Sequence, residues 1–284
     1  MRMRWGLLFI PAMVVFGIFY LIPLIMFVLS SFHPDLGLGR SGATYTIENF
    51  RHLFTDRFYL LVLWNTAKLS IYIVTISLIL GFPVAYFLAR SSQKVTRVLI
   101  PILVLSSFVT LVIRAMGWVV LLGNNGLVNK TLLLLGAISD PIQLLNHPRG
   151  VVLGMVHYVL PLMILAIMSV IQTIPRSLEQ AAENLGASRL HVYTRVIFPL
   201  SFNGILATSL MVFSLNMGVF ASPLLLGGGK VYVFPILIYQ EIMAKTHYAM
   251  GAAMALALIL LVLFINILSF SIGSKYQAPR RRAW

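Results

Sequence analysis

Six long apolar stretches dominate the pattern of hydrophobic and polar residues along the chain. A helix needs about 20 apolar residues to cross the hydrocarbon of a bilayer, and the stretches that meet this requirement are roughly residues 6–31, 60–89, 98–122, 151–174, 196–222 and 249–273. The pattern predicts an all-α integral membrane protein with six transmembrane helices. The first stretch is too long for a signal-peptide core and lacks a small-residue cleavage site, so we expect it to remain as a span.

Positive charge predicts the orientation of these spans. Four short segments on one side hold more than half of the basic residues, namely Arg2 and Arg4, then Arg90, Lys94 and Arg97, then Arg176, Arg189 and Arg195, and finally Lys275 and Arg280–Arg282. Because loops rich in Lys and Arg stay in the cytoplasm, both termini are predicted to be cytoplasmic. The outer connections are then about 32–59, 123–150 and 223–248. The second contains a short apolar run, Thr131–Ile138, which could form an interfacial helix.

Composition agrees with a chain that lives in a bilayer. Hydrophobic residues make up 60% of the chain, charged residues 10%, and the mean hydropathy is +0.94, far from the values of a soluble domain. The net charge of +14 would suggest nucleic acid in a soluble protein. Here the basic inner loops account for it, so membrane lipid is the expected partner and nucleic acid is not.

The sequence lacks the motifs of an enzyme or a metalloprotein. No cysteine is present, no HExxH motif occurs, and the histidines are scattered, so we expect no metal ligands and no catalytic residues. Gly227–Lys230 is not a phosphate-binding loop because the first glycine of that motif is missing. We therefore expect the chain to bind no cofactor itself and to hydrolyse no ATP.

Acidic residues avoid the six predicted spans. All seven lie outside them: Asp35, Glu48, Asp56, Asp140, Glu179, Glu183 and Glu241. Ion-coupled porters commonly carry protons or sodium on carboxylates near the bilayer midplane. Their absence there counts against such a porter, but backbone carbonyls alone can hold sodium. A self-contained ion-coupled porter or channel therefore stays open as the alternative function.

The inner loop between the fourth and fifth spans reads as two short helices. Ser177 is predicted to cap the first helix, with Gln180 as the reciprocal member of a capping box. Gly186 is predicted to end that helix in a left-handed conformation, and Ser188 to cap the second. An apolar face follows from the helical spacing of Leu178, Ala181, Ala182 and Leu185. Spacing alone leaves two roles open for this face, docking into a partner protein or packing on lipid headgroups.

This loop resembles the EAA loop of ABC transporter permeases. Ala181, Ala182, Gly186 and Pro199 match that pattern at the correct spacing, while Val196 and Phe198 replace its usual Ile and Leu. Gln180 stands at the position of the usual Glu, with Glu179 just before it. Asn65–Thr66 resembles the start of the core domain of type I importer permeases, and three further segments are similar to the spermidine/putrescine permease branch: Arg114–Trp118, Gly126–Asn129 and Gly218–Gly228.

The resemblance implies a fold, a role and a set of partners. It divides the chain into a first helix and outer loop (1–60), a permease core (61–274) with a coupling loop at about 175–199, and a basic tail (275–284). The partners would be an ABC ATPase dimer that binds ATP, a second homologous permease and an extracytoplasmic solute-binding protein, all at a bacterial inner membrane. The cargo would be a small organic solute of the polyamine class or a related one. The residues implied to couple to the ATPase are Glu179, Gln180, Ala181, Ala182, Glu183, Gly186 and Pro199.

Polar residues inside the spans are candidates for the lining of the pathway. In the third predicted span they recur every four residues and share one helical face: Ser106, Thr110, Arg114 and Trp118. Lys68 in the second span and Asn216 in the fifth are further candidates. Arg114 and Lys68 either line the pathway or extend to the headgroups. The outer loops hold five acids against more bases, a poor lining for a polycation, so an organic anion such as an opine or an aminophosphonate stays possible.

Overall fold

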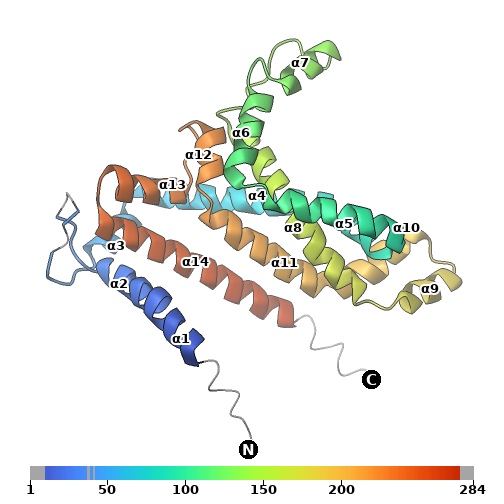
Figure 1. The fold of residues 1–284 in the computed structure, drawn as a ribbon, viewed down its shortest axis with the longest axis horizontal. Helices are drawn as coiled ribbons and strands as arrows, with labels where there is room; N and C mark the ends of the chain where they lie inside the picture. The colour runs from blue at the N-terminus through green and yellow to red at the C-terminus, as the bar shows by residue number, and fades with distance from the viewer. Residues whose placement is uncertain (1–9, 37–38, 41, 276–284) are drawn as a thin grey trace, which may run out of the picture. The chain divides into compact units, whose positions relative to one another are not determined.

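The computed structural model describes residues 10–36, 39–40 and 42–275, and the regular elements in these ranges are all helical (Figure 1). The all-α prediction is therefore confirmed. Six helices are long and apolar enough to span a membrane: Met13–Ser30, Arg57–Arg90, Leu111–Leu134, Pro148–Gln172, Arg189–Gly218 and Tyr248–Ser271. The charges that we used at both termini, Arg2, Arg4 and Arg280–Arg282, lie outside the described residues.

The third predicted span, 98–122, is wrong as one continuous helix. The structure has α5 (Gln93–Phe108) and α6 (Leu111–Leu122), which are separated by Val109 and Thr110 in extended conformation. Thr110 caps α6, because its hydroxyl oxygen accepts the N–H of Ile113 at 3.4 Å. This side chain offers the backbone an alternative to continuing the helix, which is how Thr favours a cap over a helix interior. The candidate span here joins α6 to α7 (Leu127–Leu134), which overlaps only the first half of the apolar run Thr131–Ile138.

The described residues form two compact units, and the first comprises Met1–Leu63 and Phe234–Leu261. Its elements are α1 (Ile10–Phe16), η2 (Gly17–Leu21), α2 (Ile22–Ser30), α3 (Glu48–Thr55), the start of α4 (Arg57–Arg90), α13 (Phe234–Tyr239), η4 (Gln240–Ala244) and the first half of α14 (Tyr248–Lys275). None of the span Met13–Ser30 is buried within the protein. Its apolar side chains are thus available to lipid or to a partner helix.

Buried polar contacts hold the outer connections of this first unit. Asn49 donates to the carbonyls of Ser31 (2.9 Å) and His33 (2.8 Å), which fixes α3 against the end of α2. Glu241 is buried and accepts from Lys245 at 2.6 Å, and His247 lies 3.1 Å from its second oxygen. Each buried polar group thereby finds a partner, as burial requires.

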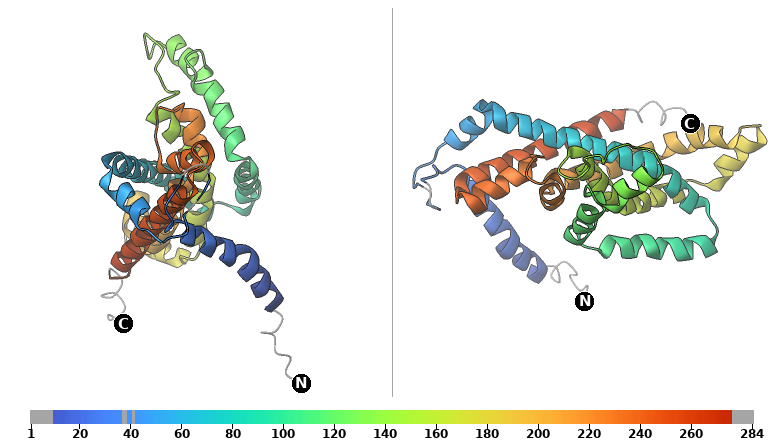
Figure 2. Two further views of the ribbon diagram at one scale, coloured as in Figure 1. Left: turned by 90° about the vertical axis from the view of Figure 1, so that its left-hand side faces the viewer. Right: turned by 90° about the horizontal axis from the view of Figure 1, so that it is seen from above.

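The second unit comprises Trp64–Val233 and Val262–Trp284 and is built around α8 (Pro148–Gln172). Its other elements are α4 from Trp64 onward, α5, α6, α7, α9 (Arg176–Asn184), α10 (Arg189–His191), η3 (Val192–Ile197), α11 (Phe198–Gly218), α12 (Ala221–Gly227) and the end of α14. α8 packs against α5, α6, α11 and α12, and 56% of its apolar window is buried, more than in any other candidate span. Short elements project from this packed core, namely α7, which follows α6, and the pair α9 and α10 (Figures 1 and 2).

The packing of α11 on α8 depends on a glycine. A Cβ atom at Gly204 would overlap the branched side chain of Val170, with the Cβ of Val170 only 2.9 Å away. Val170 lies near the end of α8, so its backbone is fixed by the core. Close approach of two helices at a small residue is a common source of packing energy in membrane proteins, where the hydrophobic effect does not draw helices together.

We predict that Gly204→Val lowers stability by about 1–3 kcal/mol, the usual cost of overpacking a core. The matched control is Gly117→Val in α6, where nothing lies within 4 Å of the added Cβ. Both glycines are helical, so the change in helix propensity is the same in the two variants. Thermal unfolding of the purified protein should show a lower midpoint for Gly204→Val alone. Equal midpoints would contradict the assigned α8–α11 contact.

Candidate functional sites

The loop that resembles the EAA segment forms a helical hairpin of α9 and α10. α9 ends at a Schellman motif: the N–H of Ala187 donates to the carbonyl of Ala182 (3.0 Å) and that of Gly186 to Glu183 (2.9 Å). Gly186 has φ +86°, so its predicted left-handed conformation is confirmed. Ser188 caps α10 by accepting the N–H of His191 at 3.3 Å, as predicted.

The predicted cap of α9 by Ser177 is wrong. α9 begins at Arg176, so Ser177 lies inside its first turn and Pro175 occupies the N-cap position. Pro175 has φ −59° and no side-chain acceptor, and only its carbonyl enters the first turn, accepting from Leu178 at 3.2 Å. The fixed φ of proline starts this helix without a capping box.

Glu179 anchors α9 to the end of α4. Its carboxylate, in a residue only 9% exposed, pairs with Arg90 at 2.5 Å and accepts the hydroxyl of Tyr86 at 2.9 Å. Arg90 also donates to the carbonyl of Ile174 (3.0 Å), and Arg176 donates to the carbonyl of Arg90 (3.1 Å). Glu179, and not Gln180 at the position of the usual Glu, therefore makes the polar contacts of this segment within the chain. Gln180 is exposed.

The apolar face of α9 is left uncovered in this chain. Leu178 and Leu185 are 45% and 89% exposed, Ala181 is exposed and Ala182 is half-buried. Glu183 is exposed as well, and Pro199 lies in the first turn of α11, which leads out of the hairpin. The structure thus brings the predicted coupling residues into one hairpin, with a small-residue surface facing outward and Glu179 facing inward.

Ser106, Arg114 and Trp118 of the third predicted span lie in one cluster in spite of the helix break, whereas Thr110 is exposed and caps α6 instead. Arg114 is only 7% exposed and donates to the carbonyls of His157 (3.3 Å) and Tyr158 (3.4 Å) in α8 and to the Ser106 hydroxyl (3.4 Å). Trp118 donates its indole N–H to Nδ1 of His157 at 3.2 Å. These residues form a polar cluster between α5, α6 and α8 in which Arg114 is buried, Ser106 and Trp118 are half-buried and His157 is exposed.

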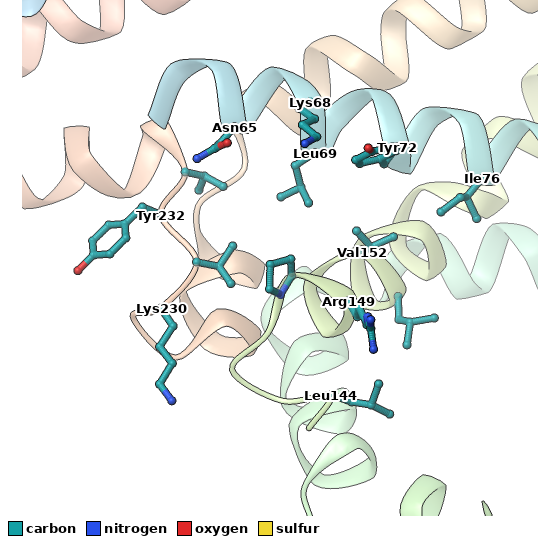
Figure 3. A pocket seen from close by; sticks show the side chains of 14 residues that line it. Asn65, Lys68, Leu69, Tyr72, Ile76, Leu144, Arg149, Val152, Lys230 and Tyr232 are labelled. Atoms are coloured by element: carbon teal, nitrogen blue, oxygen red, sulfur yellow. The ribbon is translucent and has the colours of Figure 1, made fainter. Parts of the chain in front are cut away.

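Lys68 lies elsewhere, on the wall of a cavity of about 680 Å³ (Figure 3). Lys68 and Tyr72 come from α4, Arg149 from the start of α8, and Lys230 and Tyr232 from the segment between α12 and α13. Asn216 is not among its lining residues; this side chain is buried in α11, and its amide has no hydrogen-bond partner among the described residues. The predicted pathway residues therefore occupy three separate places in the second unit.

Sequence reasoning missed Arg149 and Lys230. Both follow residues that are typical of turns: Pro148 precedes Arg149, and Gly227–Gly229 precede Lys230. Gly228 and Gly229 have φ of +52° and +74°. These turns mark loop ends, but nothing in the local pattern reveals that both loops meet the same face of α4. Only the tertiary arrangement brings the three cations to one cavity.

The sequence of this chain is similar to those of known transport proteins. The family model described as "Binding-protein-dependent transport system inner membrane component" matches residues 74–278. The spermidine/putrescine transport system permease PotB of Haemophilus influenzae is 34% identical over 244 residues, covering 86% of this chain and 85% of that protein. PotB of Escherichia coli is 31% identical, covering 85% and 87%. A putative 2-aminoethylphosphonate transport system permease, PhnU of Salmonella choleraesuis, is 26% identical, covering 92% and 91%.

Solved structures share the fold. A chain of a bacterial alginate ABC transporter, in complex with an alginate-bound periplasmic protein, matches with a TM-score of 0.77 at 20% identity, covering 96% of this chain and 95% of that one. A chain of the MetNI methionine ABC transporter in an inward-facing conformation matches with a TM-score of 0.56 at 16% identity, covering 76% and 97%. The helical arrangement described above is thus one that known importer chains adopt.

We predict that Glu179→Ala loosens the α9–α10 hairpin, because Arg90 loses its carboxylate partner in a largely buried place. A lost buried charge-assisted contact of about 1–3 kcal/mol corresponds to roughly tenfold to a hundredfold faster hydrogen exchange of the loop amides. The control is Glu183→Ala, which removes an exposed carboxylate from the same helix. Hydrogen exchange of residues 174–189 followed by mass spectrometry measures the effect. The same protection in both variants would show that the ion pair does not hold the hairpin.

Proposed function

The chain belongs to the family of binding-protein-dependent transport system inner membrane components, the permeases of ABC importers, and on that premise we propose that it forms half of an ATP-driven pathway for a small organic solute. It is a multi-pass inner-membrane protein and a transport subunit. The solute would be a polyamine or a related amine, as the names of its relatives suggest. Residues 61–274 would form the permease core and 275–284 a cytoplasmic tail.

The observation that carries this proposal is the α9–α10 hairpin. Its exposed apolar face, with small side chains at Ala181 and Ala182, allows close approach of another protein surface, and no other segment of the described chain presents the family pattern there. We propose that this hairpin is the coupling loop and docks into a cleft of the ATPase, one copy of an ATPase dimer. ATP would be bound by that partner, and the permease itself would hold no cofactor.

The remaining partners follow from the same premise. A second, homologous permease would complete the pathway, and an extracytoplasmic binding protein would deliver the solute. Both termini would lie in the cytoplasm, in keeping with the basic inner loops. In this arrangement the exposed apolar side chains of Met13–Ser30 would face lipid or the second permease.

Family membership favours the importer over a self-contained porter or channel. The six candidate spans contain none of the seven acidic residues, so no carboxylate lies within them to carry a proton or sodium ion. The energy source is then a partner protein rather than an ion gradient acting on this chain.

Gly186→Val and Ala182→Trp should sever communication with the ATPase while the protein still reaches the membrane. Valine at φ +86° costs roughly 1 kcal/mol or more, and a large side chain at position 182 would push a docked partner away. Since about 1.4 kcal/mol of lost docking energy is tenfold in occupancy, uptake and substrate-stimulated ATP hydrolysis should each fall at least about tenfold in reconstituted complexes.

Each of these two variants has a matched control. Gly136→Val imposes the same backbone strain in the predicted outer connection, since Gly136 has φ +67° and, like Gly186, nothing within 4 Å of an added Cβ. Asn184→Trp adds the same bulk on the opposite side of α9, two residues after Ala182. Full coupled transport by both loop variants would show that the hairpin is only a connector.

We also predict that the natural complex contains two different membrane subunits. Purification through a tag on this chain should recover a second, homologous permease together with the ATPase, in equal amounts of the two permeases. Quantitative mass spectrometry of the purified complex gives the ratio. An ATPase-active assembly whose only permease is this chain would overturn the heteromeric arrangement.

A further inference from the structure

The cavity beside α4 is cationic and contains no carboxylate. Lys68, Arg149 and Lys230 contribute three positive charges to its wall, Asn65 and two tyrosines contribute hydrogen-bonding groups, and none of its described lining residues is acidic. Figure 3 shows Lys68 on α4, Arg149 on α8 and Lys230 on the loop at the lower left, with the amine of Lys230 directed away from α4. Three separate segments of the chain therefore place like charges around one space.

These three cations have no anionic partner in the described chain. The ion pairs within the described ranges join Glu179 and Glu241 to other bases, and Lys68 has only a distant contact with the ring of Tyr72, at 6.0 Å. Like charges around one opening repel one another, and a cleft lined by one sign of charge concentrates ions of the opposite sign. Arg149 lies in the first turn of α8, so the positive N-terminal end of the dipole of this 25-residue helix adds to the positive charge at the cavity.

The depth of the cavity places it at the outer mouth of the predicted pathway. Arg90 marks the cytoplasmic end of α4, and Lys68 lies 22 residues earlier, about 33 Å along the helix at a rise of 1.5 Å per residue. The hydrocarbon is about 30 Å thick. Lys68 therefore lies near the outer boundary, where a delivered solute would first meet the permease.

We propose that this cavity receives the anionic group of the transported solute, a carboxylate or a phosphonate. The inference rests on the proposed importer function and narrows its cargo to amines that also carry a negative charge, in place of plain polyamines. A polyamine carries only positive charge and would meet three unneutralised cations at the entrance, an arrangement that costs energy and discriminates against it. An aminophosphonate or an amino acid conjugate offers the charge that the cavity lacks, and guanidinium and ammonium groups bind such anions well.

The test uses the complete complex with its partner permease and ATPase in nanodiscs of phosphatidylcholine. The probes are radiolabelled 2-aminoethylphosphonate, glutamate and putrescine, and equilibrium binding is measured for each. The variant combines Lys68→Gln, Arg149→Gln and Lys230→Gln. Lys130→Gln is the control, because it removes an exposed base from α7, outside the cavity.

We expect at least one of the two anionic probes to bind saturably and putrescine to bind more weakly. The triple variant should bind that anion about tenfold or more weakly, as expected for lost charge-assisted hydrogen bonds, and Lys130→Gln should bind it normally. Unchanged anion binding in the triple variant, no saturable binding of either anion, or tighter binding of putrescine would each overturn the proposal. Uptake of the same solutes is measured separately with the complete complex in proteoliposomes, and the absence of ATP-driven uptake of any of them would instead refute the importer function itself.

Anionic lipid headgroups share the same phosphate chemistry, so a second arm separates them from solute. The binding measurement is repeated in nanodiscs that contain phosphatidylglycerol, with native mass spectrometry to detect retained lipid. Solute binding that is the same in both membranes supports the proposal. Phosphatidylglycerol that is retained by the normal protein, lost from the triple variant and able to displace the anionic probe would overturn it.

Discussion

The ion pair between Arg90 and Glu179 anchors the α9–α10 hairpin to the end of α4. Its two side chains are only 14% and 12% exposed, and a carboxylate and a guanidinium in such a place depend strongly on each other, since removal of one leaves the other largely desolvated and unpaired. Arg90 also donates to the carbonyl of Ile174, so the pair fixes the chain where it enters α9. A force on the hairpin is therefore passed to the end of α4.

The same helix reaches the outer cavity. α4 carries Arg90 at its last residue and Lys68 one bilayer thickness earlier, so one continuous helix connects the proposed docking surface to the proposed solute entrance. α8, the most buried span, packs on α4 at Gly81 and contributes Arg149 to the cavity. Two packed helices thus join the two functional regions, and a rigid packed element is a physically reasonable carrier of coupling.

The sequence predicted two local features of the hairpin correctly, but it missed the start of α9, the break at Thr110 and the contacts that depend on tertiary structure. Gly186 and Ser188 were assigned correctly because a left-handed residue and an N-cap are each determined by the few residues around them. The break at Thr110 was missed because the apolar run continues across it, and hydropathy does not record the competition between a side-chain cap and the helix. Of the three cations that line the cavity, the sequence pattern indicated only Lys68, since Arg149 and Lys230 reach the cavity from distant loops.

We propose that the energy for transport reaches this chain from a bound ATPase. The most direct test is solute uptake into proteoliposomes that contain the purified complex and its binding protein, with ionophores present to collapse every ion gradient. We expect uptake to require ATP on the side of the α9–α10 hairpin and to stop when ATP or the ATPase is omitted. Uptake by this permease without the ATPase, driven by a proton or sodium gradient alone, would contradict it.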